Sequence, residues 1–346
     1  MRCLVIRHAA LGDGLQASCI LPYLHRDGYE IDFLANERCR NVLENNPYIS
    51  KFINHEDHWD EDDDESLGDY WDRMGEGYDK VVNCTGIVEN EMLFVYPSDE
   101  YFLTMRQRRK LVEGKNYYDQ HLKRAGYEPD KDNPPKMEIY FSKEEKRRGK
   151  WWKKRHKNEF KIMWSLTGSS NHKVYRYFEP LAREFLDTHG DAYIYTNGDY
   201  ASKLLTFQHP RVKNLMFMED FSFRDAMLLT KQCDLVIGPE TGLLMAAGAW
   251  KIPKILLLSH SGPEQVTKYW DNVYPLLAPC WCSPCYILWK YKYIWQHICQ
   301  IDDTIQENGR SNYYPDFATP KCTEHGQDDI KQIMEKIYVD WKKIRS

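Results

Sequence analysis

The sequence predicts an α/β protein of two domains, each built on a parallel β-sheet covered by helices on both faces. Short apolar runs typical of buried strands alternate with amphipathic runs of helical period. This alternation stops once, at a strongly basic segment, and then restarts. A chain of 346 residues also exceeds the usual size of one hydrophobic core. Two Rossmann-like halves that face a central cleft are therefore expected.

In the first half, apolar runs predict strands and longer amphipathic runs predict helices. The predicted strands are 2–6, 30–35, 51–53, 80–83 and 137–141, and the predicted helices are 15–26, 37–45 and 98–125. The acidic run 55–65 predicts a solvated loop, with a metal-binding acid cluster as the alternative. Ser142 and Glu145 match a capping box that opens a basic helix ending near Asn158.

The second half repeats the pattern. The predicted strands are 160–165, 192–196, 235–238 and 254–259, and the predicted helices are 177–188, 223–231, 243–250 and 327–345. We therefore expect a first domain over 1–158, a second over 159–326 and a terminal helix over 327–346.

Composition narrows the class of protein. The hydrophobic content of 42% is that of an ordinary globular protein, and the net charge of −5 argues against a nucleic-acid binder that relies on bulk charge. No apolar run reaches membrane-spanning length, and the amino terminus resembles a strand rather than a signal peptide, so a cytoplasmic location is expected. The basic helix is interpreted as a solvated face, with a phosphate-bearing partner as the alternative.

The first predicted strand leads directly into a loop that carries a single carboxylate. Asp13 stands between Gly12 and Gly14 and is the only acid in the first 26 residues. In open α/β sheets, ligands bind at the carboxyl ends of the strands. Asp13 is therefore a candidate catalytic base, and the alternative is a helix N-cap.

Two loops of the second half suit a diphosphate. Thr167, Gly168 and Ser169 follow a predicted strand and offer hydroxyls and backbone N–H groups. Glu240, Thr241 and Gly242 open a predicted helix whose amino end favours an anion without any metal, and Glu240 is suited to accept from sugar or ribose hydroxyls. Lys173 follows the first loop and would neutralise charge on a leaving diphosphate. A glycine at a strand-to-helix turn is usually only a turn residue, so each loop alone is weak evidence.

These motifs resemble a known family. The stretch at 7–14, with ALGD at 10–13, is similar to the start of the ADP-heptose glycosyltransferases of the lipopolysaccharide inner core. The stretch DLVIGPETGLLMAAGAWKIPKILL at 234–257 is similar to their donor-binding segment. The resemblance implies a GT-B fold, with a terminal helix that crosses back to pack on the first domain. It also implies an inverting transfer with no catalytic metal.

The same resemblance assigns roles. Asp13 takes the position of the base that deprotonates the acceptor hydroxyl, and Lys173 the position of a lysine near the donor phosphates. Thr241 and Gly242 match the phosphate-contacting pair.

Two positions depart from the family pattern. Glu240 stands where the family has Asp, and Met245 stands where it commonly has His. Both departures concern the identity of the sugar rather than the transfer itself.

Five late cysteines form a separate group in the segment 280–322, a Cys-rich finger of the second domain. Cys282 and Cys285 form a CxxC pair, and with Cys299 and Cys322 they give four thiolates for a closed tetrahedral site. The arrangement resembles the iron-binding finger of the autotransporter heptosyltransferases and implies structural iron or zinc. The alternative is that Cys280 or Cys322 is a bystander and that no metal binds.

The sequence is thus interpreted as an inverting glycosyltransferase that moves a sugar, most simply from ADP-heptose, to a hydroxyl. The acceptor stays open among lipopolysaccharide core, a protein hydroxyl and a modified DNA base, and a homo-oligomer is also left open. The alternatives are a nucleotide-sugar epimerase and a non-catalytic metal-stabilised scaffold of the same fold.

Overall fold

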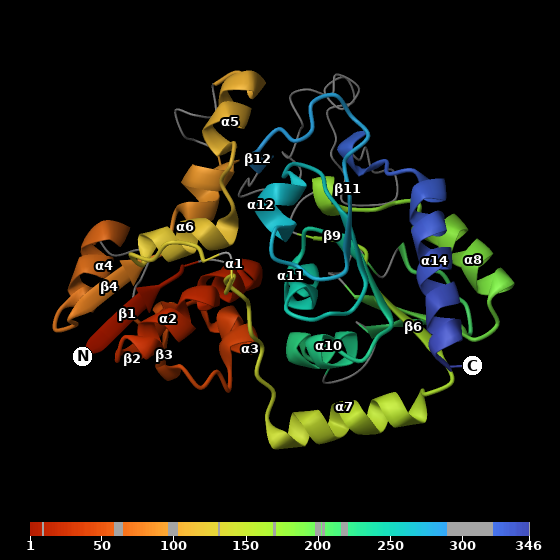
Figure 1. The fold of residues 1–346 in the computed structure, drawn as a ribbon, viewed down its shortest axis with the longest axis horizontal. Coiled ribbons are helices and arrows are strands. Elements are labelled where there is room, and N and C mark those ends of the chain that lie inside the picture. Colours follow the sequence, from red (N-terminus) through yellow and green to blue (C-terminus); the bar gives the residue numbers. More distant parts are fainter. Residues whose placement is uncertain are drawn as a thin grey trace. The chain divides into compact units, whose positions relative to one another are not determined.

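The computed structural model contains two compact units, shown together in Figure 1 and described here separately. Unit 1 comprises 1–92 and 115–142, and unit 2 comprises 93–114 and 143–346. The structure describes residues 1–8, 10–58, 65–95, 103–130, 132–168, 171–197, 202, 205–215, 221–288 and 321–345. None of the helices within these ranges is both long enough and apolar enough to cross a membrane.

Unit 1 is a four-stranded parallel sheet in the order β3-β2-β1-β4. The strands are β1 (Arg2–Ile6), β2 (Glu30–Ala35), β3 (Ile49–Asn54) and β4 (Lys80–Asn83). The helical segments are α1 (Leu11–Ala17), η1 (Ser18–Ile20), α2 (Leu21–Arg26), η2 (Glu37–Cys39), α3 (Arg40–Leu43), η3 (His55–Asp57), α4 (Leu67–Gly75), η4 (Ile87–Met92) and α6 (Tyr117–Arg124). Leu4, Ile6 and Leu34 form the centre of its core because β1 lies between two other strands.

Unit 2 is a six-stranded parallel sheet in the order β11-β10-β9-β6-β7-β8. Its strands are β6 (Phe160–Ser165), β7 (Ala192–Asn197), β8 (Val212–Asn214), β9 (Leu235–Pro239), β10 (Lys254–Leu257) and β11 (Val273–Leu276). The helical segments are α5 (Met105–Val112), α7 (Lys143–Arg155), η6 (Asn171–Lys173), α8 (Phe178–Thr188), α10 (Phe223–Thr230), α11 (Gly242–Gly248), α12 (Pro263–Thr267), η9 (Lys321–Thr323) and α14 (Gln327–Arg345). All six residues of β6 are buried, as expected for a central strand of a sheet covered on both faces.

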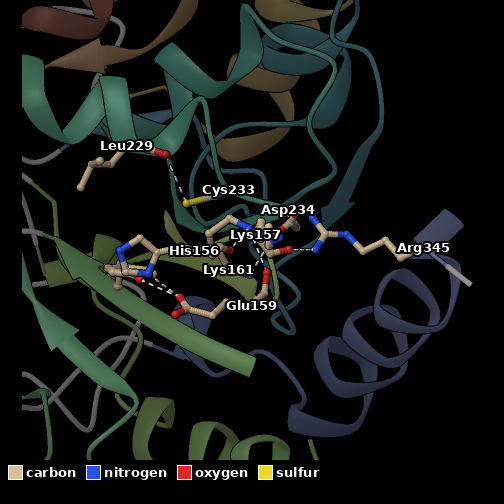
Figure 2. A network of polar contacts seen from close by, with 9 residues as sticks. His156, Lys157, Glu159, Lys161, Leu229, Cys233, Asp234 and Arg345 are labelled. Carbon is tan, nitrogen blue, oxygen red and sulfur yellow. Dashed lines mark hydrogen bonds and ion pairs between the residues drawn. The ribbon is translucent and has the colours of Figure 1, made fainter. Parts of the chain in front are cut away.

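The start of β6 is fixed by a buried lysine (Figure 2). Lys161 is fully buried, and its Nζ lies 2.6 Å from Asp234 Oδ2 and 2.9 Å from the carbonyl oxygen of Glu159. The backbone N–H of Lys161 donates to the same carboxylate at 2.9 Å. An ammonium group removed from water requires such partners, and these contacts tie the turn before β6 to the turn before β9.

Several expectations about boundaries differ from the structure. The predicted helix 98–125 contains two separate helices, α5 and α6. The range 137–141 is extended but pairs with no strand among the described residues, so it is a connection rather than a strand. The first unit ends at 142 rather than at 158, because α7 packs on α10, where Gly149 lies against Leu228.

The terminal helix α14 belongs to unit 2, where it packs beside α8 (Figure 1). The expected contact of 327–346 with the first domain stays a prediction. The apolar stripe of α14, which includes Ile330, Met334 and Tyr338, is part of the core around β6. The Tyr338 hydroxyl also donates to Asp191 Oδ1 at 2.5 Å.

The segment 93–114 leaves unit 1 and joins unit 2. The short strand β5 (Phe94–Val95) pairs in parallel with β12 (Ile287–Leu288). Arg108 donates to the carbonyl oxygen of Cys285 at 3.1 Å, and Arg109 donates to that of Pro284 at 3.0 Å. Two arginines of α5 therefore hold the turn that carries the late cysteines.

Candidate functional site

The carboxyl end of β1 in unit 1 holds a buried guanidinium between two carboxylates. Arg7 follows β1 directly, and its side chain is fully buried. Its Nη2 lies 2.9 Å from Glu89 Oε1 and 3.1 Å from Asp13 Oδ2, while Nη1 donates to the carbonyl oxygen of His8 at 2.7 Å. Burial alone would lower the pKa of Arg7, but Asp13 and Glu89 outweigh it and raise that pKa.

Asp13 does not cap a helix. Helix α1 begins at Leu11, its N-cap is Ala10 without a side-chain cap, and Asp13 lies in the first turn. Its carboxylate faces Arg7 and keeps 17% of its side-chain surface exposed. Gly14 allows α1 to pack closely, because a Cβ there would lie 2.9 Å from Cys39 Sγ. The arrangement gives a partly exposed, ion-paired carboxylate beside β1.

Sequence reasoning missed the second carboxylate. Glu89 lies in η4, a single π-helical turn that follows β4, and β4 is the neighbour of β1 in the sheet. Such turns occur often at functional sites. The available signal was an acid shortly after the carboxyl end of a predicted strand at 80–83, the same rule that selected Asp13.

In unit 2, the predicted donor-binding residues come together at the carboxyl ends of β6 and β9. Ser165 Oγ lies 3.1 Å from Thr241 Oγ1, and Thr241 also caps α11, whose first residue is Gly242. A Cβ at Gly168 would lie 2.8 Å from Lys173 Cβ and 3.1 Å from Thr241 Cγ2. Thr167 is buried just after β6, whereas Ser169 lies outside the described residues.

Glu240 is buried and already engaged within unit 2. Its Oε2 accepts from the Ser259 backbone N–H at 3.3 Å and from the Ser259 hydroxyl at 3.4 Å. His260 Nδ1 lies 3.4 Å from the same oxygen and 2.9 Å from Ser259 Oγ. Burial, with a smaller effect of Lys173, lowers the pKa of His260 far below its usual value, so this contact joins a carboxylate to a neutral imidazole.

Three histidines lie near Glu240, and two of them, His172 and His260, were not selected from the sequence. The His172 and His260 rings are 4.9 Å apart, and His172 and His325 line a small hollow with Tyr175 and Pro239. Burial lowers the pKa of His325 to about 4. His260 follows the predicted strand 254–259, so its position at the carboxyl end of that strand was the available signal.

Some of the late cysteines lie in contact with one another. Cys282 Sγ lies 3.5 Å from Cys280 Sγ, and Cys280 also hydrogen-bonds with Cys322. Cys280, which is not among the four predicted ligands, therefore contacts two of them. Cys299 lies outside the described residues. Among the residues that are described, no group of three or more His, Cys, Asp or Glu side chains is arranged to hold a metal ion, although thiols are a donor set that iron and zinc favour.

Known structures share this fold, although no protein-family model and no curated protein sequence matches the chain. A structure of a glycosyl transferase family 9 protein from Veillonella parvula matches 98% of this chain and 97% of its own, with a TM-score of 0.62 and 12% identity. The E. coli ADP-heptose lipopolysaccharide heptosyltransferase II matches 80% of this chain and 90% of its own, with a TM-score of 0.56 and 15% identity.

A third match is the bacterial iron-containing dodecameric glycosyltransferase TibC from enterotoxigenic E. coli. It covers 98% of this chain and 76% of its own, with a TM-score of 0.59 and 11% identity. At these identities the likeness concerns the fold, and it confirms the predicted GT-B architecture. The chain has the fold of family 9 glycosyltransferases and ADP-heptose heptosyltransferases.

Proposed function

We propose that the protein is a glycosyltransferase that moves a sugar from a nucleotide-diphosphate donor to a hydroxyl acceptor, with ADP-heptose as the donor. The observation that carries this proposal is the convergence of Gly168, Lys173 and Thr241 at one edge of the unit 2 sheet. A diphosphate needs a cation, backbone N–H groups and hydroxyls, and it needs space, which a glycine provides. The fold shared with heptosyltransferases supports the same choice of donor.

Asp13 is the proposed general base and unit 1 the proposed acceptor-binding unit. The acceptor hydroxyl gives its proton to Asp13 while its oxygen bonds to the anomeric carbon, and the bond from that carbon to the diphosphate oxygen breaks. The electron pair leaves on the nucleoside diphosphate, whose charge Lys173 neutralises. One displacement of this kind inverts the anomeric centre.

Glu240 has a narrower proposed role than the sequence suggested. Because Ser259 and His260 hold Oε2, the carboxylate is fixed before any sugar arrives. A fixed acceptor selects sugar hydroxyls by position. We therefore propose that Glu240 determines which donor sugar is accepted.

The proposal is tested by incubating the purified protein with ADP-heptose, and in parallel with UDP-glucose and GDP-mannose, while release of nucleoside diphosphate is followed. We expect slow release from ADP-heptose with water as acceptor and faster release with the correct hydroxyl acceptor. A matched variant, Lys173→Met, should reduce release. Silence with every donor would favour the non-catalytic scaffold, and interconversion of sugar epimers would favour the epimerase.

We further propose that the late cysteines bind one structural iron or zinc ion, with Cys282, Cys285, Cys299 and Cys322 as ligands. The contact of Cys282 with Cys280 and the iron in TibC support this proposal. Such an ion would stabilise the segment and would take no part in transfer. Metal analysis of protein purified without added metal tests it, and less than about half an equivalent of iron plus zinc would overturn it.

A homo-oligomer is also proposed, since TibC is dodecameric. Light scattering of the full chain measures this directly.

A further inference from the structure

The Arg7 cluster of unit 1 holds one cation and two carboxylates. A single nitrogen, Nη2 of Arg7, meets Asp13 at 3.1 Å and both Glu89 oxygens at 2.9 and 3.2 Å. Asp13 and Glu89 keep 17% and 21% of their side-chain surface exposed, whereas Arg7 keeps none. The two acids therefore share one buried guanidinium at the edge where the reaction is proposed to occur.

The thiols and the imidazole nearest this cluster are neutral near pH 7. Burial raises the pKa of the Cys39 thiol, which lies near Asp13, and that of Cys84, near Arg7, to about 12 each. Burial lowers the pKa of His121, which feels both Arg7 and Glu89, to about 3. Arg124 is engaged by Glu91. The electrostatic potential at the Asp13 carboxylate thus depends mainly on Arg7 and on how closely Glu89 pairs with Arg7.

We infer that Glu89 is a positioning residue for Asp13, in that it holds Arg7 and so prevents the guanidinium from pairing fully with the base. This inference rests on the proposed role of Asp13. A carboxylate bound by a dedicated guanidinium is a poor proton acceptor, because protonation would leave a buried cation without its partner. With Glu89 present, Arg7 keeps a carboxylate partner after Asp13 takes the proton.

The geometry supports this division between the two acids. Glu89 engages Arg7 through hydrogen bonds to both of its oxygens, as a permanent partner would. The structure places it on η4, and Asp13 on α1, so the two carboxylates approach Arg7 from separate elements. The next acid along the same π-helical turn, Glu91, pairs with Arg124 instead and supplies a matched control.

The test compares Glu89→Gln with Glu91→Gln, using ADP release from ADP-heptose. We expect Glu89→Gln to lower kcat about tenfold, a partial loss of general-base catalysis, with the donor KM unchanged. The acid side of its pH–rate profile should move to lower pH, because Arg7 would then favour ionised Asp13. Glu89→Asp should recover most of the rate. Glu91→Gln should behave as wild type, and circular dichroism confirms that each variant folds.

A second readout needs no donor. Carbodiimide modifies only protonated carboxyl groups, and mass spectrometry measures its rate at Asp13. Glu89→Gln should slow this modification at pH 5, whereas Glu91→Gln should not. Equal rates in the two variants, or equal kcat values, would overturn the inference. If Asp13→Asn kept normal turnover, the proposed base would fail instead, and the carbodiimide result would still decide the relation between Glu89 and Asp13.

Discussion

The two candidate sites differ in the charged groups that they contain. The unit 1 site places a buried cation between two partly exposed carboxylates, whereas the unit 2 site combines hydroxyls, histidines, the buried Glu240, a close-packed glycine and a lysine. The first arrangement suits proton transfer, and the second suits an incoming polyanion. The difference teaches that the proposed proton acceptor and the proposed anion-binding groups belong to different compact units, so each can be altered alone.

The largest expected effect falls on unit 1. Asp13→Asn keeps the size of the side chain but removes its charge, and we expect turnover to fall by about a hundredfold or more. Donor binding should remain, because the residues proposed to bind the diphosphate lie in unit 2. Calorimetry with ADP measures binding, and ADP release measures turnover. A joint loss of both would contradict the separation of the two roles.

The next effect concerns acid stability. His121 is fully buried in unit 1, with its pKa lowered to about 3 by burial, so the unfolded chain binds a proton there that the folded unit does not. Stability should therefore fall as the pH drops from about 6.5, by about 3 kcal/mol at pH 4.

A matched pair of variants isolates this effect. His121→Gln should lose that part of the pH dependence, whereas the exposed His25→Gln should retain it. Hydrogen exchange of the β1 amides at pH 4.5 and 7 measures the difference. Equal pH dependence in the two variants would show that another group titrates.

A smaller effect is expected at the anion-binding edge of unit 2. Gly168→Ala adds a Cβ that would lie 2.8 Å from Lys173 Cβ, so the loop must shift. We expect ADP affinity to weaken by about tenfold, the cost of one displaced charged contact. Gly190→Ala is the control, since its Cβ would meet nothing within 4 Å. Unchanged affinity in Gly168→Ala would remove this loop from the site.

The smallest effect tests which unit holds the terminal helix. Tyr338→Phe removes the hydroxyl that donates to Asp191, and we expect a loss of about 1 kcal/mol. Hydrogen exchange should rise in β6 and leave β1 unchanged. Faster exchange in β1 would instead link α14 to unit 1.

Much of the fold could be predicted from the sequence because periodicity reports burial directly. The boundaries of β1, β2, β4, β6 and α14 match the predicted ranges, since each is a strongly apolar or amphipathic run. The strand predicted at 137–141 was wrong because an extended apolar segment has the same sequence pattern as a strand, whether or not a partner strand lies beside it. The unit to which 93–114 belongs depends on contacts with 281–288, far away in sequence.

The candidate site was predicted only where a residue follows its own strand. Asp13, Gly168 and Thr241 were selected by that rule, and their roles stay predictions. Glu89 and His260 were missed because their relevance depends on partners from other elements, Arg7 and Glu240. No local pattern marks such a partnership.

Because Lys161 is buried, its reaction with an acylating reagent would report the opening of unit 2. The Lys161 amine is enclosed between the turns before β6 and β9, out of reach of acylating reagents, and Lys254 is enclosed in the same unit. Brief acetylation followed by peptide mapping should therefore label the surface lysines of α7 and spare these two. Labelling of Lys161 would mark the moment at which the larger sheet opens, independently of any enzymatic assay.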